Sequence, residues 1–333
     1  MEESKRITMK KIAQRAKVSL ATVSRVVSGS SSIRPSLRKA VEEAVRDLGY
    51  TSTKPRERTR VKKIAVMVPD ITNPFFPLLL KGIANIARVQ NVQIALYDSS
   101  TDETIEKNNI NMLLNNGING LIMIPFSEHI SPMILKLIEE KFPLVFLDRE
   151  IDREDISSVT SDNEEGAFQA TKYLLDLGHK DILFISGPPH LSTSRLRARG
   201  YERALADHKI DYKGELVVVG DTSFESAYYE VNKAIDDKIR FTAVFASNDL
   251  MALGARRAIE NHGFRVPDDF SLIGYDDIGF SSYFSLTTIA QPSYEMGKNS
   301  LMLLLDIMAQ KRISPQRIVL RDSFIIRNSC RKI

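Results

Sequence analysis

The sequence predicts two folds in one chain: an N-terminal all-α helix-turn-helix headpiece, and an α/β core of two lobes, each with a doubly wound parallel sheet. Three observations support this prediction. The first 63 residues are strongly basic, whereas the rest of the chain is acidic. Three short helical patterns, separated by brief turns, occupy the first 50 residues. From residue 64 onwards, short apolar runs alternate with longer amphipathic segments, which is typical of parallel sheets covered by helices.

Charge is divided unevenly along the 333 residues. Residues 1–63 contain 17 Lys and Arg against 6 Asp and Glu, a net charge of +11. The other 270 residues carry 29 against 36, a net charge of −7. A basic module on an acidic body favours binding of nucleic acid by that module. A basic surface that is merely solvated is the alternative that charge alone leaves open.

Composition argues against several other classes of protein. The single cysteine, Cys330, cannot form an internal disulfide and fits a reducing cytoplasm. The five histidines lack HxH or HxxxH spacing, so we expect no metal site, and we expect no cofactor. No apolar run approaches the ~18 residues of a membrane span. The charged start of the chain is unlike a secretory signal, so we expect a cytoplasmic protein with no membrane contact.

The headpiece is predicted to contain three helices, over residues 7–16, 20–27 and 35–48. The hydroxyls of Thr8 and Ser19 are expected to cap the first two helices. Pro35 suits the first position of the third helix, and Gly49 ends it. Only three residues separate the first two helices, which describes a helix-turn-helix unit.

The second helix of such a unit can enter the major groove of DNA with its N-terminal residues at the base edges. Arg25 can donate two hydrogen bonds to guanine, and Leu20 and Ala21 can contact thymine methyl groups. Short hydroxyl side chains suit phosphates. The predicted DNA contacts of the headpiece are Thr8, Ser19, Leu20, Ala21, Thr22, Ser24, Arg25 and Ser28. A three-helix domain that binds protein is the alternative, but packing alone does not require an exposed Arg25 among small hydroxyls.

The core follows a βαβ order that restarts near residue 163. The predicted strands are 64–68, 92–97, 120–124, 144–147, 182–185, 216–219, 243–246, 271–274 and 287–290. The predicted helices are 76–89, 104–116, 132–141, 163–177, 196–208, 225–236 and 249–262. Ligands of open parallel sheets bind beyond the carboxyl ends of the strands, so two facing sheets are expected to enclose a cleft.

Polar and aromatic residues follow these strands. They are Asn73, Phe75, Phe76, Asp148, Arg149, Ser186, Gly187, Arg197, Asp221, Thr222, Asn248, Asp249, Asp276, Asp277 and Gln291. Carboxylate, amide and guanidinium groups match vicinal hydroxyl pairs of a sugar, and phenylalanine faces suit its C–H groups. One such residue alone is more often a loop cap, but their joint occurrence at seven strand ends favours a sugar site.

A long segment, MKKIAQRAKVSLATVSRVVS at residues 9–28, resembles the headpiece of the LacI/GalR repressor family, and the resemblance continues to about residue 328. The core also resembles ribose-type repressors and the periplasmic ribose-binding protein, through Asn73-Pro-Phe-Phe76, Leu147-Asp-Arg149, Arg197-Ala-Arg-Gly200, Asn248-Asp-Leu-Met-Ala-Leu-Gly254, Gly274-Tyr-Asp276 and Ile289-Ala-Gln291. The resemblance implies a periplasmic-binding-protein-like type I core and a transcriptional repressor of a sugar-utilisation operon, which is not an enzyme. It also implies a nucleoid-associated homodimer on a pseudo-palindromic operator.

The resemblance further implies that a small sugar, ribose or a similar pentose or hexose, binds between the lobes and controls DNA affinity. The implied ligand residues are Asn73, Phe75, Phe76, Asp148, Arg149, Arg197, Thr222, Phe224, Asn248, Asp276 and Gln291. Thr222 stands where the family has an aromatic residue, and Phe224 is the expected substitute. The pair Asp148-Arg149 argues against a nucleobase, because purine-binding relatives lack it.

Residues 1–50 are thus predicted to be the headpiece, 51–63 the linker and 64–328 the core. The first lobe is expected over about 64–160 and 293–318, and the second over about 161–291 and 319–328. The linker departs from the family, because no leucine between Leu48 and Leu78 is available to wedge into the minor groove. Arg56 and Arg58 can still enter a narrow minor groove.

Three alternatives stay open at this stage. The first is a transport sugar-binding protein, although the basic headpiece argues against it. The second is an enzyme, although the chain has no P-loop, GxSxG or GxGxxG motif. The third is a regulator of the same family that responds to a phosphoprotein corepressor or a phosphorylated metabolite. The pair Asp148-Arg149 favours direct binding of a sugar over this third alternative.

Overall fold

The structure is a computed structural model that describes residues 8–27, 33–50, 61–127, 130–311 and 314–333. The chain forms two compact units, Met1–Val61 and Lys62–Ile333. Ser28, Arg56 and Arg58, and with them most of the predicted linker, lie outside the described residues. Within the described ranges, no helix combines the length and apolar character that a membrane span requires.

The first unit contains helices α1 (Met9–Ala16), α2 (Leu20–Val27) and α3 (Pro35–Asp47). Its small core is formed by Ile12, Val23 and Val41, all fully buried, together with the neighbouring alanines. Ser19 caps α2 as predicted, because its Oγ accepts a hydrogen bond of 3.1 Å from the Thr22 amide. The predicted cap of α1 is wrong.

Thr8 precedes α1, but its hydroxyl makes no capping hydrogen bond. The Thr8 backbone carbonyl instead accepts from the amides of Lys11 and Ile12. Thr8 is exposed, so water can satisfy the first amides of the helix without its side chain.

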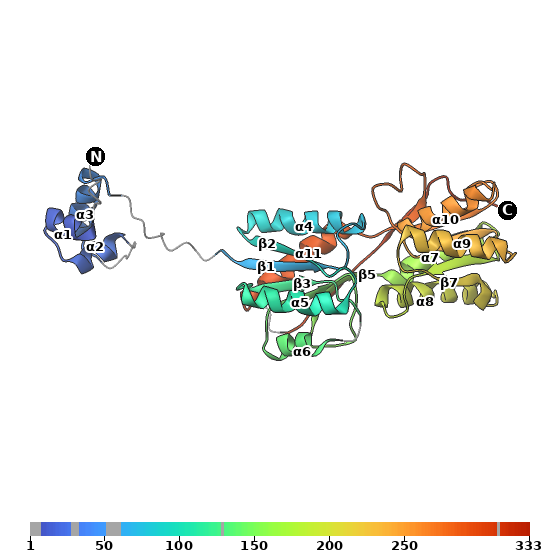
Figure 1. Cartoon of the computed structure of the whole chain (residues 1–333), viewed down its shortest axis with the longest axis horizontal. Coiled ribbons are helices and arrows are strands. Elements are labelled where there is room, and N and C mark those ends of the chain that lie inside the picture. The colour runs from blue at the N-terminus through green and yellow to red at the C-terminus, as the bar shows by residue number, and fades with distance from the viewer. Residues whose placement is uncertain (1–7, 28–32, 51–60, 128–129, 312–313) are drawn as a thin grey trace. The chain divides into compact units, whose positions relative to one another are not determined.

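The first lobe of the core is a parallel sheet with the strand order β11-β5-β4-β3-β1-β2. Its strands are β1 (Lys63–Val68), β2 (Gln93–Asp98), β3 (Gly120–Met123), β4 (Leu144–Leu147), β5 (Ser157–Ser161) and β11 (Arg317–Leu320). Its helices are α4 (Phe75–Val89), α5 (Glu103–Asn115), α6 (Pro132–Glu139) and α11 (Ser293–Met308). Figure 1 shows α4 and α11 on one side of this sheet and α5 and α6 on the other.

The second lobe repeats the plan with the strand order β12-β10-β9-β8-β6-β7. Its strands are β6 (Ile182–Ser186), β7 (Val217–Val219), β8 (Ala243–Ala246), β9 (Ser271–Asp276), β10 (Thr287–Ala290) and β12 (Ser323–Ile325). Its helices are α7 (Asn163–Asp176), α8 (Ser192–Asp207), the short 3₁₀ helix η1 (Gly214–Leu216), α9 (Phe224–Asp236) and α10 (Asp249–Asn261). Among its pairs, β12 alone runs antiparallel, beside β10.

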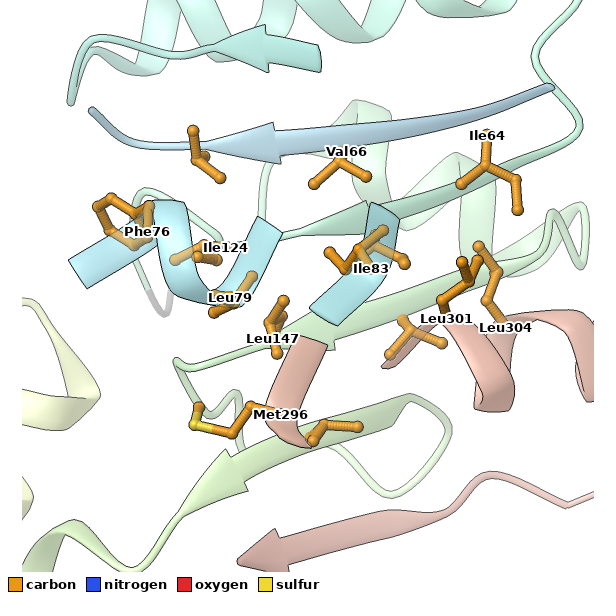
Figure 2. Packing of buried hydrophobic residues seen from close by; sticks show 14 of the residues in the cluster. Ile64, Val66, Phe76, Leu79, Ile83, Ile124, Leu147, Met296, Leu301 and Leu304 are labelled. Atoms are coloured by element: carbon orange, nitrogen blue, oxygen red, sulfur yellow. The ribbon is translucent and has the colours of Figure 1, made fainter. Parts of the chain in front are cut away.

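Each sheet carries one apolar cluster on each face. In the first lobe, Ile64, Val66 and Val68 of β1 face α4 and α11, whereas Ala65 and Met67 face α5 and α6. Figure 2 shows the first of these clusters, to which α4 contributes Leu79 and Ile83 and α11 contributes Met296, Leu301 and Leu304. Burial on both faces explains why these strands are continuously apolar.

The predicted fold class is confirmed, with three differences in detail. The sequence prediction missed β5, whose residues Ser-Ser-Val-Thr-Ser are polar although all five are buried. It also missed helix α11 and the strands β11 and β12, two short strands with partly exposed residues. Helix α8 begins at Ser192, four residues before the predicted start. The polar composition of β5 and of the start of α8 hides them from a search for apolar periodicity, whereas β11 and β12, with four and three residues, are too short to show one.

Candidate functional site

A cavity of about 80 Å³ lies between the two lobes of the core. Its lining is Pro69, Asp70, Asn73, Phe75, Phe76, Thr101, Asp148, Arg149, Leu191, Thr193, Arg197, Thr222, Asn248, Asp276 and Gln291. Every predicted ligand residue except Phe224 is in this set. They meet there because the carboxyl ends of parallel strands from both sheets face the same space. The volume suits a small ligand, since pockets for larger organic ligands measure about 300–1,000 Å³.

Asp148 and Arg149 follow β4 and are both at least nine-tenths buried. Asp148 has a left-handed backbone with φ of 67°, which aspartate tolerates better than most residues. The Arg149 guanidinium donates a hydrogen bond of 2.8 Å to the Pro125 carbonyl. Within the described part of the chain, Asp148 Oδ1 and Arg149 Nε are buried without a hydrogen-bond partner. A buried acceptor and a buried donor without partners call for a ligand or water.

Arg197 of α8 reaches the cavity from the second lobe. Its Nε donates to Asn163 Oδ1 at 2.8 Å, and another nitrogen donates to the Ser247 carbonyl. Its guanidinium lies 3.7 Å from the ring centroid of Tyr275 and 3.6 Å from Asp276 Oδ1. These contacts leave Arg197 little freedom, so the second-lobe side of the cavity is preorganised.

Two amide side chains are fixed in a similar way. Gln291 Nε2 donates a hydrogen bond of 2.7 Å to Asp276 Oδ1. Asn248 caps α10, because its Oδ1 accepts from the Met251 amide at 2.7 Å, and its Nδ2 donates to the Thr222 carbonyl at 2.9 Å. The cavity walls are therefore held by their own hydrogen bonds.

The two aromatic residues stand on the first-lobe side. The rings of Phe75 and Phe76 meet edge to face, with centroids 5.2 Å apart, at the first turn of α4. Asn73 Oδ1 accepts a hydrogen bond from the Phe75 amide at 3.0 Å, which fixes this turn. An apolar ring edge beside the polar groups suits an amphipathic ligand.

The charges of the cavity are close to balance. Burial raises the pKa of Asp148, and the nearby Arg149 and Arg197 guanidiniums oppose the rise. Burial also raises the pKa of Asp276 well above its usual range, and Arg197 opposes that shift. With Asp70, three carboxyls face two arginines in the lining. This balance favours an uncharged polar ligand over an anion, and ligand hydroxyls that donate to the carboxyls would favour their ionised forms.

The lobes touch at residues next to the lining. The Glu150 amide of the first lobe donates a hydrogen bond of 2.8 Å to Ser192 Oγ of the second. The ring of Phe126 lies 5.4 Å from that of His190, again across the two lobes. These contacts adjoin Arg149 and Leu191 in sequence, so separating the lobes would open this side of the cavity.

The structure corrects the prediction for Phe224, which does not line the cavity. Phe224 is the first residue of α9, and its ring stacks on Tyr228 one turn later, with centroids 6.5 Å apart. Five further lining residues were not predicted from the sequence: Pro69, Asp70, Thr101, Leu191 and Thr193. Pro69 and Asp70 directly follow β1, so the rule used for the other strands could have found them. Leu191 and Thr193 lie where α8 begins, earlier than the sequence indicated.

The headpiece exposes the beginning of α2. Leu20 is 53% exposed, and Ser19, Ala21 and Arg25 are exposed beside it, whereas Thr22 and Ser24 are half-buried. Val23, in the same helix, is fully buried in the core of the headpiece. The start of α2 thus presents Ser19, Leu20, Ala21 and Arg25 at the surface of the headpiece.

Asp249, the first residue of α10, fixes the loop that follows Asp276. Its carboxylate accepts hydrogen bonds from the Ile278 amide at 2.9 Å, from Ser281 Oγ, and from Thr288 Oγ1 at 2.7 Å. Burial raises the pKa of Asp249 to about 6 despite these bonds. Asp249 therefore positions one wall of the cavity while remaining costly to ionise.

The raised pKa of Asp249 predicts that the free energy of unfolding depends on pH. Its pKa is higher in the folded than in the unfolded chain, so the folded state binds more protons between pH ~4 and ~6. Asp249 therefore stabilises the fold most at low pH, and this contribution falls as pH rises. We expect the difference in unfolding free energy between the natural chain and Asp249→Asn to shrink by about 2 kcal/mol from pH 4 to pH 6. Urea unfolding followed by circular dichroism measures it, and a difference that grows with pH would contradict this assignment.

Comparison with family models gives two matches. Residues 8–53 match the model described as bacterial regulatory proteins, lacI family, and residues 171–330 match a periplasmic binding protein-like domain. Catabolite control protein A of Priestia megaterium is 32% identical over 332 residues, covering 95% of this chain and 99% of that protein. The repressor CytR of Escherichia coli is 33% identical over 336 residues, covering 98% and 97%.

Solved structures give the same result. A complex of the transcriptional regulator CelR with cellobiose has a TM-score of 0.76 and 29% identity, covering 97% of this chain and 100% of that one. The lac repressor dimer bound to operator and an anti-inducer has a TM-score of 0.77 and 27% identity, covering 98% and 99%. A LacI family regulator of Enterococcus faecium with bound ribose has a TM-score of 0.73 and 31% identity, covering 82% and 100%.

Proposed function

Because this chain belongs to the LacI family of bacterial regulatory proteins, we propose that it is a repressor whose affinity for operator DNA is set by a small neutral sugar bound between its lobes. Membership of the family makes the chain a DNA-binding transcriptional regulator and not an enzyme. The proposal concerns the effector, its site and the residues that contact DNA.

One observation carries the effector proposal: Asp148 Oδ1 and Arg149 Nε, on adjacent lining residues, are a buried acceptor and a buried donor without partners in the described ranges. Each sugar hydroxyl both donates and accepts, so neighbouring hydroxyls can satisfy the two atoms together. D-ribose is the first candidate, and a similar pentose or hexose is next. The ribose-bound and cellobiose-bound relatives support a sugar as the class of ligand.

A regulator that responds to a phosphorylated metabolite or a phosphoprotein is the second candidate. The likeness to catabolite control protein A supports keeping this candidate, because that name refers to catabolites and not to one sugar. Asp70 and, when ionised, Asp148 and Asp276 balance the two guanidiniums of the lining, so a phosphorylated ligand would compete with these carboxyls for the arginines.

The test is a fluorescence-anisotropy titration of the full chain on duplex DNA that the protein selects from a random pool. The titration is repeated with D-ribose, D-ribose 5-phosphate and a panel of other pentoses and hexoses. We expect a neutral sugar to change the operator Kd by about 5- to 150-fold, the usual range of coupling between two sites. A response to the phosphate ester alone would favour the second candidate, and no response to any panel member would refute the sugar proposal.

For DNA recognition we propose that Leu20, Ala21 and Arg25 of α2 face the bases and that Ser19 and Thr22 lie near phosphates. Two headpieces of a homodimer would then bind a pseudo-palindromic operator, as the operator complex of the lac repressor dimer supports. Arg56 and Arg58 remain proposed minor-groove contacts outside the described residues.

Replacement of Arg25 by alanine is expected to cost about 1–3 kcal/mol at one base pair of each half-site and to relax specificity there. The reason is that a bidentate arginine discriminates guanine from the other bases. Binding to the selected operator and to all its single-base variants measures this effect. Equal weakening on every sequence would instead place Arg25 on a phosphate.

A further inference from the structure

Three chain segments connect the lobes of the core, because the sheets exchange strands and helices. Residues 161–163 lead from β5 to α7, residues 290–293 from β10 to α11, and residues 320–323 from β11 to β12. Figure 1 shows α11 beside α4 in the first lobe, although β10, which precedes it, belongs to the second. Any rotation of one lobe against the other must turn these three segments.

Each segment contributes one polar side chain to a hydrogen-bonded cluster, here called the hinge cluster: Ser161, Gln291 and Asp322. Ser161 Oγ lies 2.7 Å from Gln291 Oε1 and 3.4 Å from Asp322 Oδ2. A serine hydroxyl has a single proton to donate, so these two acceptors compete for it. The shorter distance shows that Ser161 donates to Gln291 in this structure, and Asp322 is the alternative acceptor within reach.

Two routes join the hinge cluster to the interlobe cavity. Gln291 itself lines the cavity and donates to Asp276 at 2.7 Å. The second route runs through Tyr275, whose hydroxyl donates to Asp322 Oδ2 and whose ring lies under the Arg197 guanidinium. Tyr275 is fully buried, so its hydroxyl has no access to water as a substitute partner.

The Asp322 side chain borders a space into which it can turn. Its Oδ1 is buried without a partner among the described residues, and the residue borders a cavity of about 450 Å³ that also touches Glu165 and Arg321. Helix α7 packs tightly against this pair at Gly166, since a Cβ there would lie 2.2 Å from Tyr275 Oη, and Glu165, Gly166 and Gln169 of the same helix also line the cavity. The Asp322 side chain thus borders the cavity, whereas the Tyr275 ring is enclosed.

We propose that the hinge cluster couples occupancy of the interlobe cavity to the angle between the lobes, with Ser161 and Tyr275 as its positioning residues. The proposal rests on the proposed function, because it concerns the same cavity. A ligand that binds Asp276 or Arg197 changes the partners of Gln291 and Tyr275. The Ser161 hydroxyl then rotates and donates its hydrogen bond to Asp322 instead of Gln291. Because each of the three residues lies on a different connecting segment, this exchange changes all three segments together. Such a two-state element, biased from the ligand site, is the physical requirement for coupling.

The test compares Tyr275→Phe and Ser161→Ala with a matched control, Tyr201→Phe. Tyr201 is also buried in the second lobe, and its hydroxyl donates to the Ile182 carbonyl at 3.0 Å, away from the hinge cluster. Tyr275→Phe and Tyr201→Phe each remove one buried phenol hydroxyl, so both are expected to lower Tm by a similar amount. The two variants should differ only in how strongly sugar binding changes the affinity for operator DNA.

The first readout is the ratio of operator Kd with and without saturating D-ribose, or the panel sugar with the largest effect. The second needs no sugar: spin labels at Asp152→Cys and Ser282→Cys, in a Cys330→Ser background, report the distance between the lobes. We expect Tyr275→Phe and Ser161→Ala to reduce the ratio at least about fivefold and to shift or broaden the sugar-free distance distribution. Tyr201→Phe should change neither.

Wild-type values of both readouts in Tyr275→Phe and Ser161→Ala would overturn the hinge proposal. If instead the natural chain responds to no sugar, the proposed function fails. The sugar-free distances of the same variants then still decide whether the hinge cluster sets the lobe angle.

Discussion

Arg149→Ala is expected to weaken sugar binding by at least about 10- to 150-fold and to remove the effect of sugar on DNA binding. Arg149 is at least nine-tenths buried in the cavity, and its Nε has no partner among the described residues. A hydrogen bond to a charged group contributes about 1.5–3 kcal/mol, which corresponds to that change in Kd. Without sugar, operator Kd should stay within about twofold, because Arg149 and the headpiece belong to different compact units. Isothermal titration calorimetry and operator anisotropy measure the two effects.

Arg153→Ala is the matched control for this experiment. Arg153 lies four residues further on and forms an exposed ion pair of 2.6 Å with Asp155, outside the cavity lining. Removing Arg149 leaves Asp148 without its nearest cation, but the raised pKa of Asp148 means that this carboxyl can protonate instead of staying charged. Arg149→Ala should therefore remain folded by circular dichroism. If a folded Arg149→Ala variant bound sugar as tightly as the natural chain does, the effector site would have to lie outside this cavity.

Operator binding is expected to depend steeply on salt. The first 63 residues carry a net charge of +11, and a dimer would bring two such headpieces to one DNA duplex. Neutralising six to ten phosphates would lower affinity by about 10³- to 10⁵-fold between about 50 and 200 mM salt. A plot of log Kd against log salt concentration, from anisotropy titrations, gives the number of phosphates directly.

Sugar binding by the same protein provides the internal control for the salt series. An uncharged ligand in a buried cavity displaces no condensed counterions, so its Kd should change little over the same range. A flat salt profile for operator binding would contradict the assignment of the basic headpiece to DNA. A steep profile for sugar binding would point to an anionic effector and so to the second candidate.

The sequence predicted those elements of the fold whose apolar pattern matches their burial. The strand Ile64–Val68 and helix α4 follow this rule, because one is apolar throughout and the other has an apolar face. Strand β5 does not follow it, because its buried residues are Ser157, Ser158, Val159, Thr160 and Ser161. These hydroxyls have partners only in the folded chain: Ser157 Oγ accepts from the Gln316 amide, and Ser161 Oγ donates to Gln291, 130 residues away. A sequence window cannot show such partners.

Most of the cavity was predictable, because strand order alone brings strand ends together. Residues next to a strand end, such as Asp148 and Asp276, were found in this way. Phe224 was misplaced, since its ring direction depends on the residue at which α9 begins. Tyr275 and Asp322 were not found as a pair, because one lies inside a buried strand and the other between two short edge strands, 47 residues apart. Their contact is a tertiary one that neither local pattern indicates.

A crystal structure of the protein grown with saturating D-ribose tests the central claim most directly. The claim predicts sugar density between the lobes, with ring hydroxyls within hydrogen-bond distance of Asp148 Oδ1 and Arg149 Nε. Sugar bound at any other place, or a cavity that holds only water at saturation, would contradict it.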